Sequence, residues 1–297
     1  MPQQFNRWNH TQSYSWPFRV FKQYYEELNL LYWSILGTKN FVYPSMKEKG
    51  LTWDLDPSAE LHIPSTKYNF ESLRGWAKGY DTSFVWTRLN FAMSLSAIFE
   101  TYLATIVSLS IESDPGLLIN APHSVDGTLF LRQGGFSRDK YDEFVVGVTK
   151  GTWTSRISAF QKLFGVTLNC WQNNISILEQ LRTKRNSIGH AYGRDISKSR
   201  QFMITEKLPI EGISDKSLMA FFDAVYKVAK NTDNYLLKTH IGEYQFILAY
   251  HSFLQTKHPQ GSLAEKAYAF RKFFGHNYTE RITRQFCIDL ATLYDSF

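Results

Sequence analysis

The sequence predicts an all-α protein: an antiparallel helical bundle with accessory helices at both ends and one small irregular or hairpin excursion. Apolar residues recur at helical spacing over long stretches, residues that favour helix N-caps precede several of these stretches, and Pro and Gly gather between them. A chain of 297 residues with 43% hydrophobic content can bury a core. We expect an accessory segment over 1–80, a helical domain over 81–240 and a helical extension over 241–297.

The N-terminal segment is expected to hold one helix followed by irregular chain. Residues 20–36 place aromatic and aliphatic side chains at helical spacing, whereas residues 37–80 carry repeated Gly and Pro, among them Pro64. This composition predicts a loop-rich connection with at most short elements. Asp81, Thr82 and Ser83 then offer N-cap oxygens to a long helix that ends near residue 110.

The rest of the chain alternates between helices and two irregular stretches. Residues 114–135 lose the helical period, and Asp126-Gly127 is a turn signal, so an irregular excursion or a small hairpin is expected. Residues 195–213 are expected to form a short strand or a loop. Helices are expected over 138–148, 152–164, 171–188, 218–238, 243–255, 263–273 and 279–294.

Composition favours a cytoplasmic protein that binds no metal and no cofactor. Cys170 and Cys287 lie far apart and match no metal or redox spacing, and residues 1–18 contain no apolar signal region. Residues 91–111 are apolar enough to suggest a membrane span. Glu100 stands at their centre, where an acidic residue costs about 2.5–3.5 kcal/mol on insertion. We therefore expect a buried helix and no membrane contact.

Positive charge is concentrated in one stretch of the sequence. The formal net charge is +6, and residues 182–200 contain six Lys and Arg residues against a single carboxylate, Asp195. Clustered cations release counterions from phosphate, which favours a nucleic-acid partner. The alternative interpretation is a solvated helix end whose cations complement the helix dipole.

The same stretch carries the residues best suited to chemistry on a phosphodiester. Arg185 can hold a phosphate in a bidentate fork, and His190 can transfer protons near neutral pH. On a regular helix the two residues lie about 140° apart. We expect Gly189 to end the helix in a left-handed cap so that His190 leaves the helical path. Arg185 follows Leu178 on the apolar stripe, so it is expected to face an interface.

The run from Arg185 through Asn186 to His190 resembles the signature of the HEPN superfamily, in which an Arg and an adjacent polar residue precede a His by four to six positions. The stretches 153–166 and 175–181 resemble the helices before that signature in HEPN ribonucleases, including the RiboL-PSP-like domains. Residues 99–103 resemble their first long helix, which often carries an acidic residue near the site; Glu100 is therefore the expected counter-ion of Arg185. The resemblance covers roughly residues 81–238.

The resemblance implies a metal-independent endoribonuclease whose site lies between two copies of the chain. His190 would act as general base or acid, Arg185 would stabilise the charge on the phosphate, and Asn186 would orient His190 or the phosphate. Toxin or antiviral roles, with an antitoxin or other regulatory partner, are further expectations. The residues expected to guide the RNA strand are Arg182, Lys184, Tyr192 and Arg194.

Two alternatives stay open at this point. The signature is also compatible with a non-catalytic RNA-binding or dimerisation module, and with an unrelated enzyme. A second Arg-to-His spacing occurs at Arg271 and His276, where a cation and aromatic residues replace the polar neighbour, and we expect a solvated helix face there. The nearest approach to metal-ligand spacing is His240 with Glu243, which we expect to be a chance pair on the surface.

Overall fold

The computed structural model describes residues 5–62 and 69–297, and within these ranges all regular structure is helical. Helices account for 71% of the residues, which confirms the all-α class. The chain forms two compact units. The first contains the N-terminal residues to Phe21 together with Phe99–Ile175 and Tyr226–Phe297, and the second contains Lys22–Ile98 and Ser176–Val225. Four helices contribute residues to both units, and the predicted division into three consecutive segments stays a prediction.

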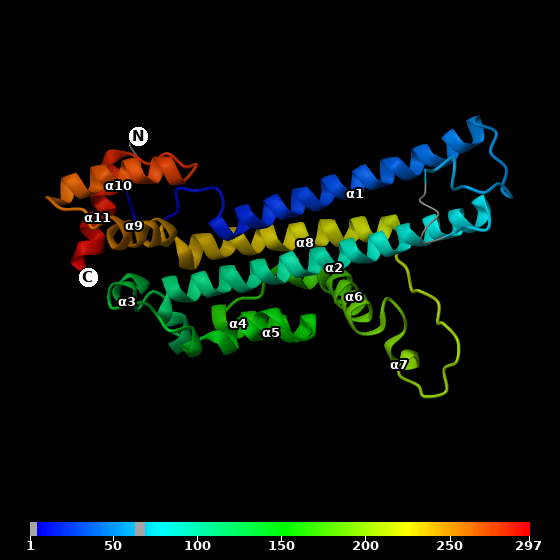
Figure 1. Ribbon diagram of the computed structural model, residues 1–297. Coiled ribbons are helices and arrows are strands. Elements are labelled where there is room, and N and C mark those ends of the chain that lie inside the picture. Colours follow the sequence, from blue (N-terminus) through cyan, green and yellow to red (C-terminus); the bar gives the residue numbers. More distant parts are fainter. Residues whose placement is uncertain (1–4, 63–68) are drawn as a thin grey trace. The chain divides into compact units, whose positions relative to one another are not determined.

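The helices follow one another in the order that Figure 1 shows by colour. They are α1 (Trp16–Glu48), α2 (Leu73–Ser113), η1 (Pro115–Ile119), α3 (Gly127–Arg132), η2 (Arg138–Lys140), α4 (Asp142–Thr149), α5 (Trp153–Phe164), α6 (Asn169–Ala191), α7 (Ile196–Ser199), α8 (Asp215–Leu236), the π-helical turn η3 (Leu237–Ile241), α9 (Tyr244–Lys257), α10 (Leu263–Asn277) and α11 (Arg284–Ser296).

In the second unit α1 is longer than the sequence predicts. It continues through Pro44 to Glu48, so the expected loop over 37–80 is wrong at its start, and α2 already begins at Leu73. Residues 63–68 of that expected loop lie outside the described residues. Tyr43 packs edge-on against Tyr80 of α2 with ring centroids 5.8 Å apart, and Met46 is buried. These contacts hold the last turns of α1 helical despite the hydrogen bond that a proline removes.

The predicted N-cap of α2 is also wrong. Thr82 and Ser83 lie inside the helix, where their hydroxyls donate to the carbonyls of Lys78 (2.7 Å) and Tyr80 (2.6 Å). The hydroxyl of Ser72 instead accepts the backbone N–H of Gly75 at the start of the helix. Ser and Thr side chains can accept a backbone N–H at a helix start or donate to a carbonyl inside the helix. Their presence alone therefore does not locate a helix start.

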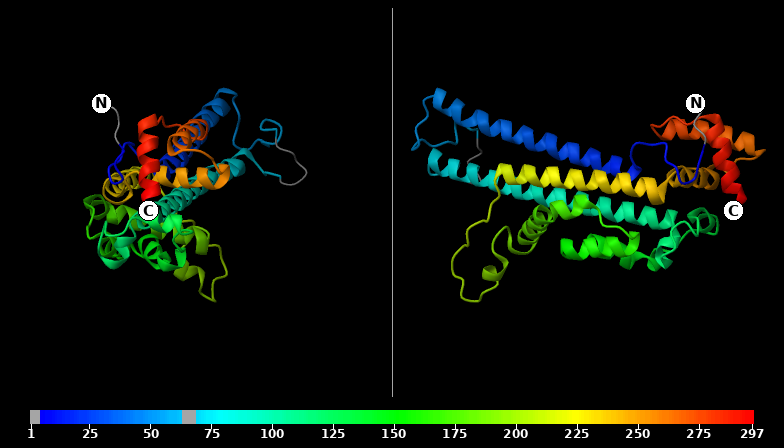
Figure 2. Two further views of the ribbon diagram at one scale, coloured as in Figure 1. Left: turned by 90° about the vertical axis from the view of Figure 1, so that its left-hand side faces the viewer. Right: turned by 180° about the vertical axis from the view of Figure 1, so that it is seen from behind.

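The first unit has an aromatic core. Trp171 of α6 is almost fully buried, its ring centroid lies 4.9 Å from that of Phe160, and its Nε1 donates to Thr232 at 2.8 Å. Both views in Figure 2 show α9, α10 and α11 gathered beside the N-terminal segment. The rings of Trp16 and Tyr278 stack there with centroids 4.8 Å apart. The three C-terminal helices are confirmed.

The two stretches without helical period contain short helices and, where described, no strand. The Asp126 carboxylate accepts the backbone N–H of Thr128 at 2.8 Å, so this turn signal opens α3 and the hairpin alternative is wrong. Asp195 likewise accepts the N–H of Lys198 and caps the four-residue helix α7, and residues 200–214 then form the loop that was the other alternative to a strand. An Asx cap at a helix start and a hairpin turn use the same residue types, which explains the error.

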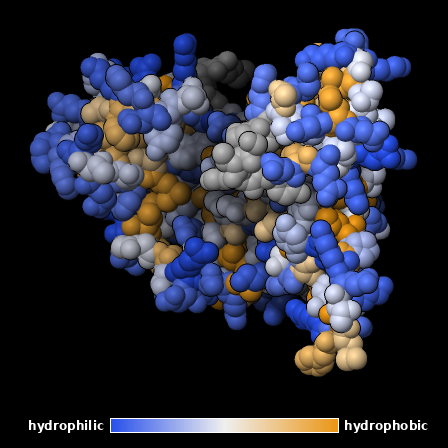
Figure 3. Space-filling model, turned by 45° about the vertical axis from the view of Figure 1, so that its right-hand side comes forward, coloured by the Kyte–Doolittle hydropathy of each residue, from blue (hydrophilic) through white to orange (hydrophobic). Residues whose placement is uncertain are grey.

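The surface in Figure 3 is mostly hydrophilic with scattered apolar patches. Within α1, Leu30, Trp33 and Phe41 are exposed apolar residues. Among the described residues, α2 is the one helix whose length and composition suffice to cross a membrane. Its central residues Leu95 and Leu103 are fully buried, which is typical of a core helix.

Candidate active site

The sequence-predicted residues lie at the C-terminal end of α6, which continues beyond the position expected. Gly189 is helical and exposed, and the helix ends only after Ala191. Tyr192 and Gly193 then adopt positive φ angles of 51° and 68°, and the Gly193 N–H donates to the Ser187 carbonyl at 3.0 Å. The expected cap at Gly189 is therefore wrong. One helical glycine costs only about 1 kcal/mol, and the cap at Gly193 satisfies the helix end.

Because the helix continues, Arg185 and His190 stay about 140° apart around its axis and about 7.5 Å apart along it. Both side chains are exposed. Gly189 and the half-buried Asn186 fall between them, so these residues form one arc around the helix in the order Arg185, Gly189, Asn186, His190. A Cβ at Gly189 would meet no atom within 4 Å. The arc thus has an open centre, with a guanidinium at one edge and an imidazole at the other.

The buried part of the apolar stripe of α6 ends before Arg185. Leu178 and Leu181 are buried, whereas Arg185 is exposed and its Nη1 lies 3.3 Å from Asn186 Oδ1. Arg185 is therefore open to a partner, and the expectation that it faces an interface stays a prediction.

The basic cluster near the arc is partly neutralised. The Arg182 guanidinium pairs with Glu179 one turn earlier, and this hydrogen bond raises the pKa of Arg182. Lys184 lies 3.3 Å from a carboxylate oxygen of Glu211. Both pairs are accessible to solvent, where such ion pairs contribute about 0–1 kcal/mol, so an RNA phosphate can compete for these cations.

Tyr192 and Arg194 follow the helix and have different surroundings. The Tyr192 side chain is exposed, and its ring centroid lies 4.1 Å from that of Trp86. Arg194 is buried, and it donates to the carbonyls of Leu208 (2.8 Å) and Tyr192 (2.6 Å). Its guanidinium therefore fixes the turn after α6 instead of facing an RNA strand, which corrects the expected role of Arg194. The Arg194 guanidinium also lies 5.0 Å from the centroid of the Tyr192 ring, so this exposed ring contacts two side chains of its own chain.

Glu100 belongs to the first unit, where its carboxylate lies 3.1 Å from the guanidinium of Arg156. Arg156 is 3% exposed, and its guanidinium lies 4.8 Å from the ring of Trp153. A buried guanidinium needs such a counter-ion. The pairing of Glu100 with Arg185 stays a prediction.

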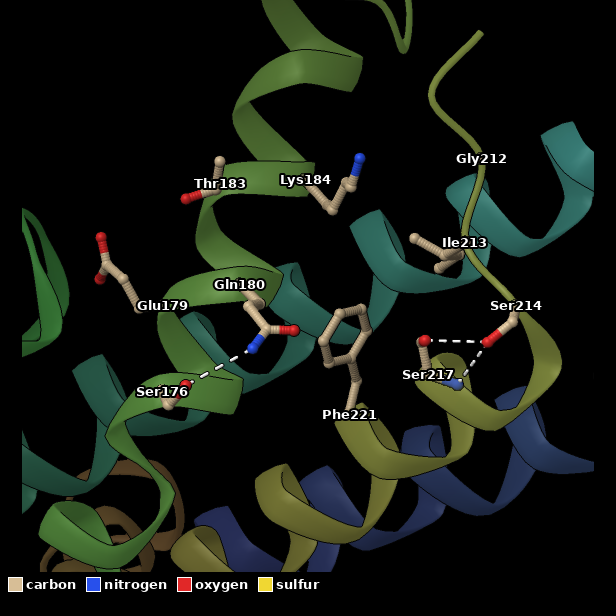
Figure 4. A pocket seen from close by; sticks show the side chains of 10 residues that line it. All are labelled: Ser176, Glu179, Gln180, Thr183, Lys184, Gly212, Ile213, Ser214, Ser217 and Phe221. Atoms are coloured by element: carbon tan, nitrogen blue, oxygen red, sulfur yellow. Dashed lines mark hydrogen bonds between the residues drawn. The ribbon is translucent and has the colours of Figure 1, made fainter.

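A pocket of about 630 Å³ lies beside α6 in the second unit, and Figure 4 shows the side chains around it. It is lined by Ser176, Glu179, Gln180, Thr183, Lys184, Gly212, Ile213, Ser214, Ser217 and Phe221. Most of these groups are hydroxyls, amides and backbone, which suit neutral hydrogen-bonding ligands such as a ribose or a base edge. Thr183 precedes His190 by seven residues, so the two residues lie on one side of α6 and about 10.5 Å apart along its axis.

The second Arg-to-His pair, Arg271 and His276, lies on α10, where both side chains contact nearby backbone carbonyls. Arg271 Nε donates to the Ile282 carbonyl at 3.1 Å, and His276 Nδ1 lies 2.6 Å from the Lys272 carbonyl in the preceding turn. His276 is exposed. These contacts are those of a helix surface, and they bring no third chemical group to the pair.

Sequence reasoning missed a buried polar cluster in the first unit. His240 and Glu243, expected as a chance pair on the surface, are 4% and 0% exposed. His240 lies beside Asp114 and near His123. Spacings of 9 and 117 residues carry no metal-ligand signal, so nothing in the sequence indicated this cluster. The chain matches no protein-family model, no curated protein and no solved structure in our comparisons.

Proposed function

We propose that this protein is a metal-independent endoribonuclease in which two copies of the chain combine the exposed arcs of α6 into one site. The observation that carries the proposal is the exposure of both Arg185 and His190 on the same two helical turns. Within one chain their separation around the helix prevents them from meeting on one phosphate. A second copy related by twofold symmetry would bring a guanidinium opposite an imidazole.

In this site the guanidinium of Arg185 binds the scissile phosphate and stabilises the charge that develops on its oxygens. The imidazole of His190 removes the proton from the 2′-hydroxyl or protonates the departing 5′-oxygen. Attack by the 2′-oxygen on phosphorus forms a 2′,3′-cyclic phosphate and breaks the bond to the 5′-oxygen, which leaves as a hydroxyl. Asn186, between the two groups on the arc, supplies an amide that can orient either of them. The 2′-hydroxyl is the nucleophile, so DNA is not cut.

The biological setting that fits this activity is a toxin or an antiviral defence effector under the control of an antitoxin or another regulatory partner. RNA cleavage without a cofactor needs such control, because substrate is abundant in every cell. This setting rests on the resemblance of residues 185–190 to the HEPN signature.

A non-catalytic RNA-binding or dimerisation module is the second candidate. One observation favours it: in a single chain, Arg185 and His190 face away from each other. Such a module would bind RNA through the cations of α6 and leave the strand intact.

The test is incubation of purified protein with total RNA, with and without EDTA. We expect cleavage in both, with 2′,3′-cyclic phosphate ends. His190→Ala and Arg185→Ala should each lower the rate by about 100-fold or more, whereas His276→Ala should not change it.

Mixing the two inactive variants tests the composite site. If Arg185 and His190 act from different copies, a mixture of Arg185→Ala and His190→Ala protein recovers part of the activity, because mixed dimers contain one intact pair. RNA binding without cleavage by the unaltered protein would establish the module instead. Activity lost in EDTA and restored by a divalent ion would overturn the metal-free mechanism.

A further inference from the structure

Three potential metal ligands converge in the first unit, well away in sequence from α6. Asp114 follows the last residue of α2, His123 lies between η1 and α3, and His240 lies in the π-helical turn after α8. One ligand atom from each residue lies within 4.8 Å of the other two. We propose that Asp114, His123 and His240 bind a divalent transition-metal ion, with zinc as the best fit.

The distances fit four-coordinate zinc. Asp114 Oδ2 lies 2.9 Å from His240 Nδ1 and 3.6 Å from His123 Nε2. With bonds of about 2.0–2.1 Å, two ligands of a tetrahedral zinc ion stand about 3.3 Å apart. The two distances bracket that value, so an ion fits between these atoms after shifts of a few tenths of an ångström. Two imidazoles and a carboxylate are also a ligand set that zinc accepts.

The charges around the cluster favour a cation. The Asp114 carboxylate is fully buried, and Oδ1 accepts the backbone N–H of His123 at 2.8 Å, so Oδ2 is the oxygen directed at both imidazoles. His123 Nε2 donates to the Thr239 carbonyl at 2.6 Å, and an ion that binds this nitrogen would replace its proton. This carbonyl belongs to the C-terminal end of the helix formed by α8 and η3, where the helix dipole is negative. A buried carboxylate at such a helix end calls for positive charge.

Arg7 interacts electrostatically with Asp114, but its ion pair and its hydrogen bonds go to other groups. Its Nε lies 2.9 Å from Asp126, and its two terminal nitrogens donate to the carbonyls of Ile241 and Ser113. Its side chain therefore neutralises Asp126 and ties the N-terminal segment to two helix ends. The described contacts leave the imidazoles as the groups directed at Asp114 Oδ2.

Two unusual backbone conformations deliver the imidazoles to the carboxylate. His123 has φ +62°, a conformation that non-glycine residues rarely adopt, and its ring stacks on Trp8 with centroids 4.2 Å apart. His240 lies in a π-helical turn, a rare element that occurs often at functional sites. Such conformations cost free energy and persist where the surrounding structure enforces them. Together they bring the imidazoles of His123 and His240 to the carboxylate of Asp114.

The position of the cluster indicates a structural ion with an accessible entry. The ion would join the end of α2, the segment before α3 and the end of α8, all within the first unit. Asp114 and His240 are buried, whereas the His123 side chain is 46% exposed, so an ion can enter past it. The cluster takes no part in the chemistry proposed for α6.

The test uses the full chain, stripped with chelator and dialysed. We expect one equivalent of Zn²⁺ to bind in calorimetry, an increase in the melting temperature, and visible absorption typical of four-coordinate Co²⁺ when cobalt replaces zinc. His123→Ala should weaken binding about 100-fold or more, and His276→Ala, an exposed histidine outside the cluster, should leave it unchanged. Asp114→Asn keeps the acceptor for the His123 N–H and serves as a second ligand variant.

Two outcomes would overturn the proposal. One is an unaltered protein that binds neither Zn²⁺ nor Co²⁺ at micromolar concentration, which would show that the cluster is a hydrogen-bonded His-Asp-His network only. The other is undiminished binding in both His123→Ala and Asp114→Asn. RNA cleavage by His123→Ala is expected to be unchanged, so failure at this cluster is distinguishable from failure of the site on α6.

Discussion

Glu243 is a fully buried carboxyl group whose surroundings favour its neutral form. One of its oxygens accepts the backbone N–H of Thr11 at 2.6 Å, whereas the other has no hydrogen-bond partner among the described residues. Burial raises the pKa of Glu243 to about 7, against the partial compensation of the Thr11 hydrogen bond and of Arg7. Folding therefore favours the protonated carboxyl.

This raised pKa predicts a pH dependence of stability. Below about pH 4.5 the carboxyl is protonated in both states, and the stability is fully present. As the pH rises towards 7 only the unfolded chain ionises, so the free energy of unfolding falls by about 3 kcal/mol. Glu243→Gln should remove that part of the decrease. Denaturant unfolding of both proteins at pH 4.5 and pH 8 measures how much the free energy of unfolding decreases between the two pH values. An equal decrease in the two proteins would contradict the prediction. Asp233, whose pKa burial raises to about 6, titrates in both proteins.

At the scale of the element, Pro44 tests whether α1 continues to Glu48. The residue lies inside the helix and is exposed. If the helix is continuous, Pro44→Ala restores an N–H for the preceding turn and should raise the free energy of unfolding by about 1–3 kcal/mol. If the segment were a loop, the same change would lower stability, because the unfolded chain would gain freedom. The sign of the change in denaturant unfolding decides between the two.

The open centre of the α6 arc gives a second prediction at this scale. Gly189→Leu should leave stability unchanged or slightly higher, because a Cβ there meets nothing and glycine is a poor helix former. It should nevertheless abolish cleavage by filling the surface between Arg185 and His190. Gly275→Leu is the matched control, since Gly275 is helical, exposed and equally uncrowded beside His276. Equal activity of the two variants would place the site elsewhere.

At the scale of the whole molecule, the proposed site requires two copies. We expect light scattering at micromolar concentration to give twice the mass of one chain, because a single α6 cannot present Arg185 and His190 to one phosphate. Gly189→Leu should shift this equilibrium towards the monomer, and Gly275→Leu should not. A protein that stays strictly monomeric yet cleaves RNA would contradict the composite site.

The helical class and most helix positions followed from the sequence, because the spacing of apolar residues is a local property. The helices α5, α6 and α8 through α11 lie within a few residues of their predicted bounds, and Thr152 accepts the Ser155 N–H as its cap position requires. The errors fall where local signals are ambiguous. Pro44 and Gly189 are tolerated inside helices, and Asp126 caps a helix instead of forming a hairpin turn.

The amino-acid sequence by itself determined that the protein is helical and that Arg185 and Asn186 lie near the end of one helix. Only the tertiary structure decided what surrounds them: that Arg194 is buried, that Arg156 pairs with Glu100, and that His123 and His240 meet at Asp114. The physical reason is the sequence separation between the residues that determine each property. Helix formation depends on residues within four positions of one another, whereas burial and ligand convergence depend on contacts between residues that lie from 9 to 126 positions apart.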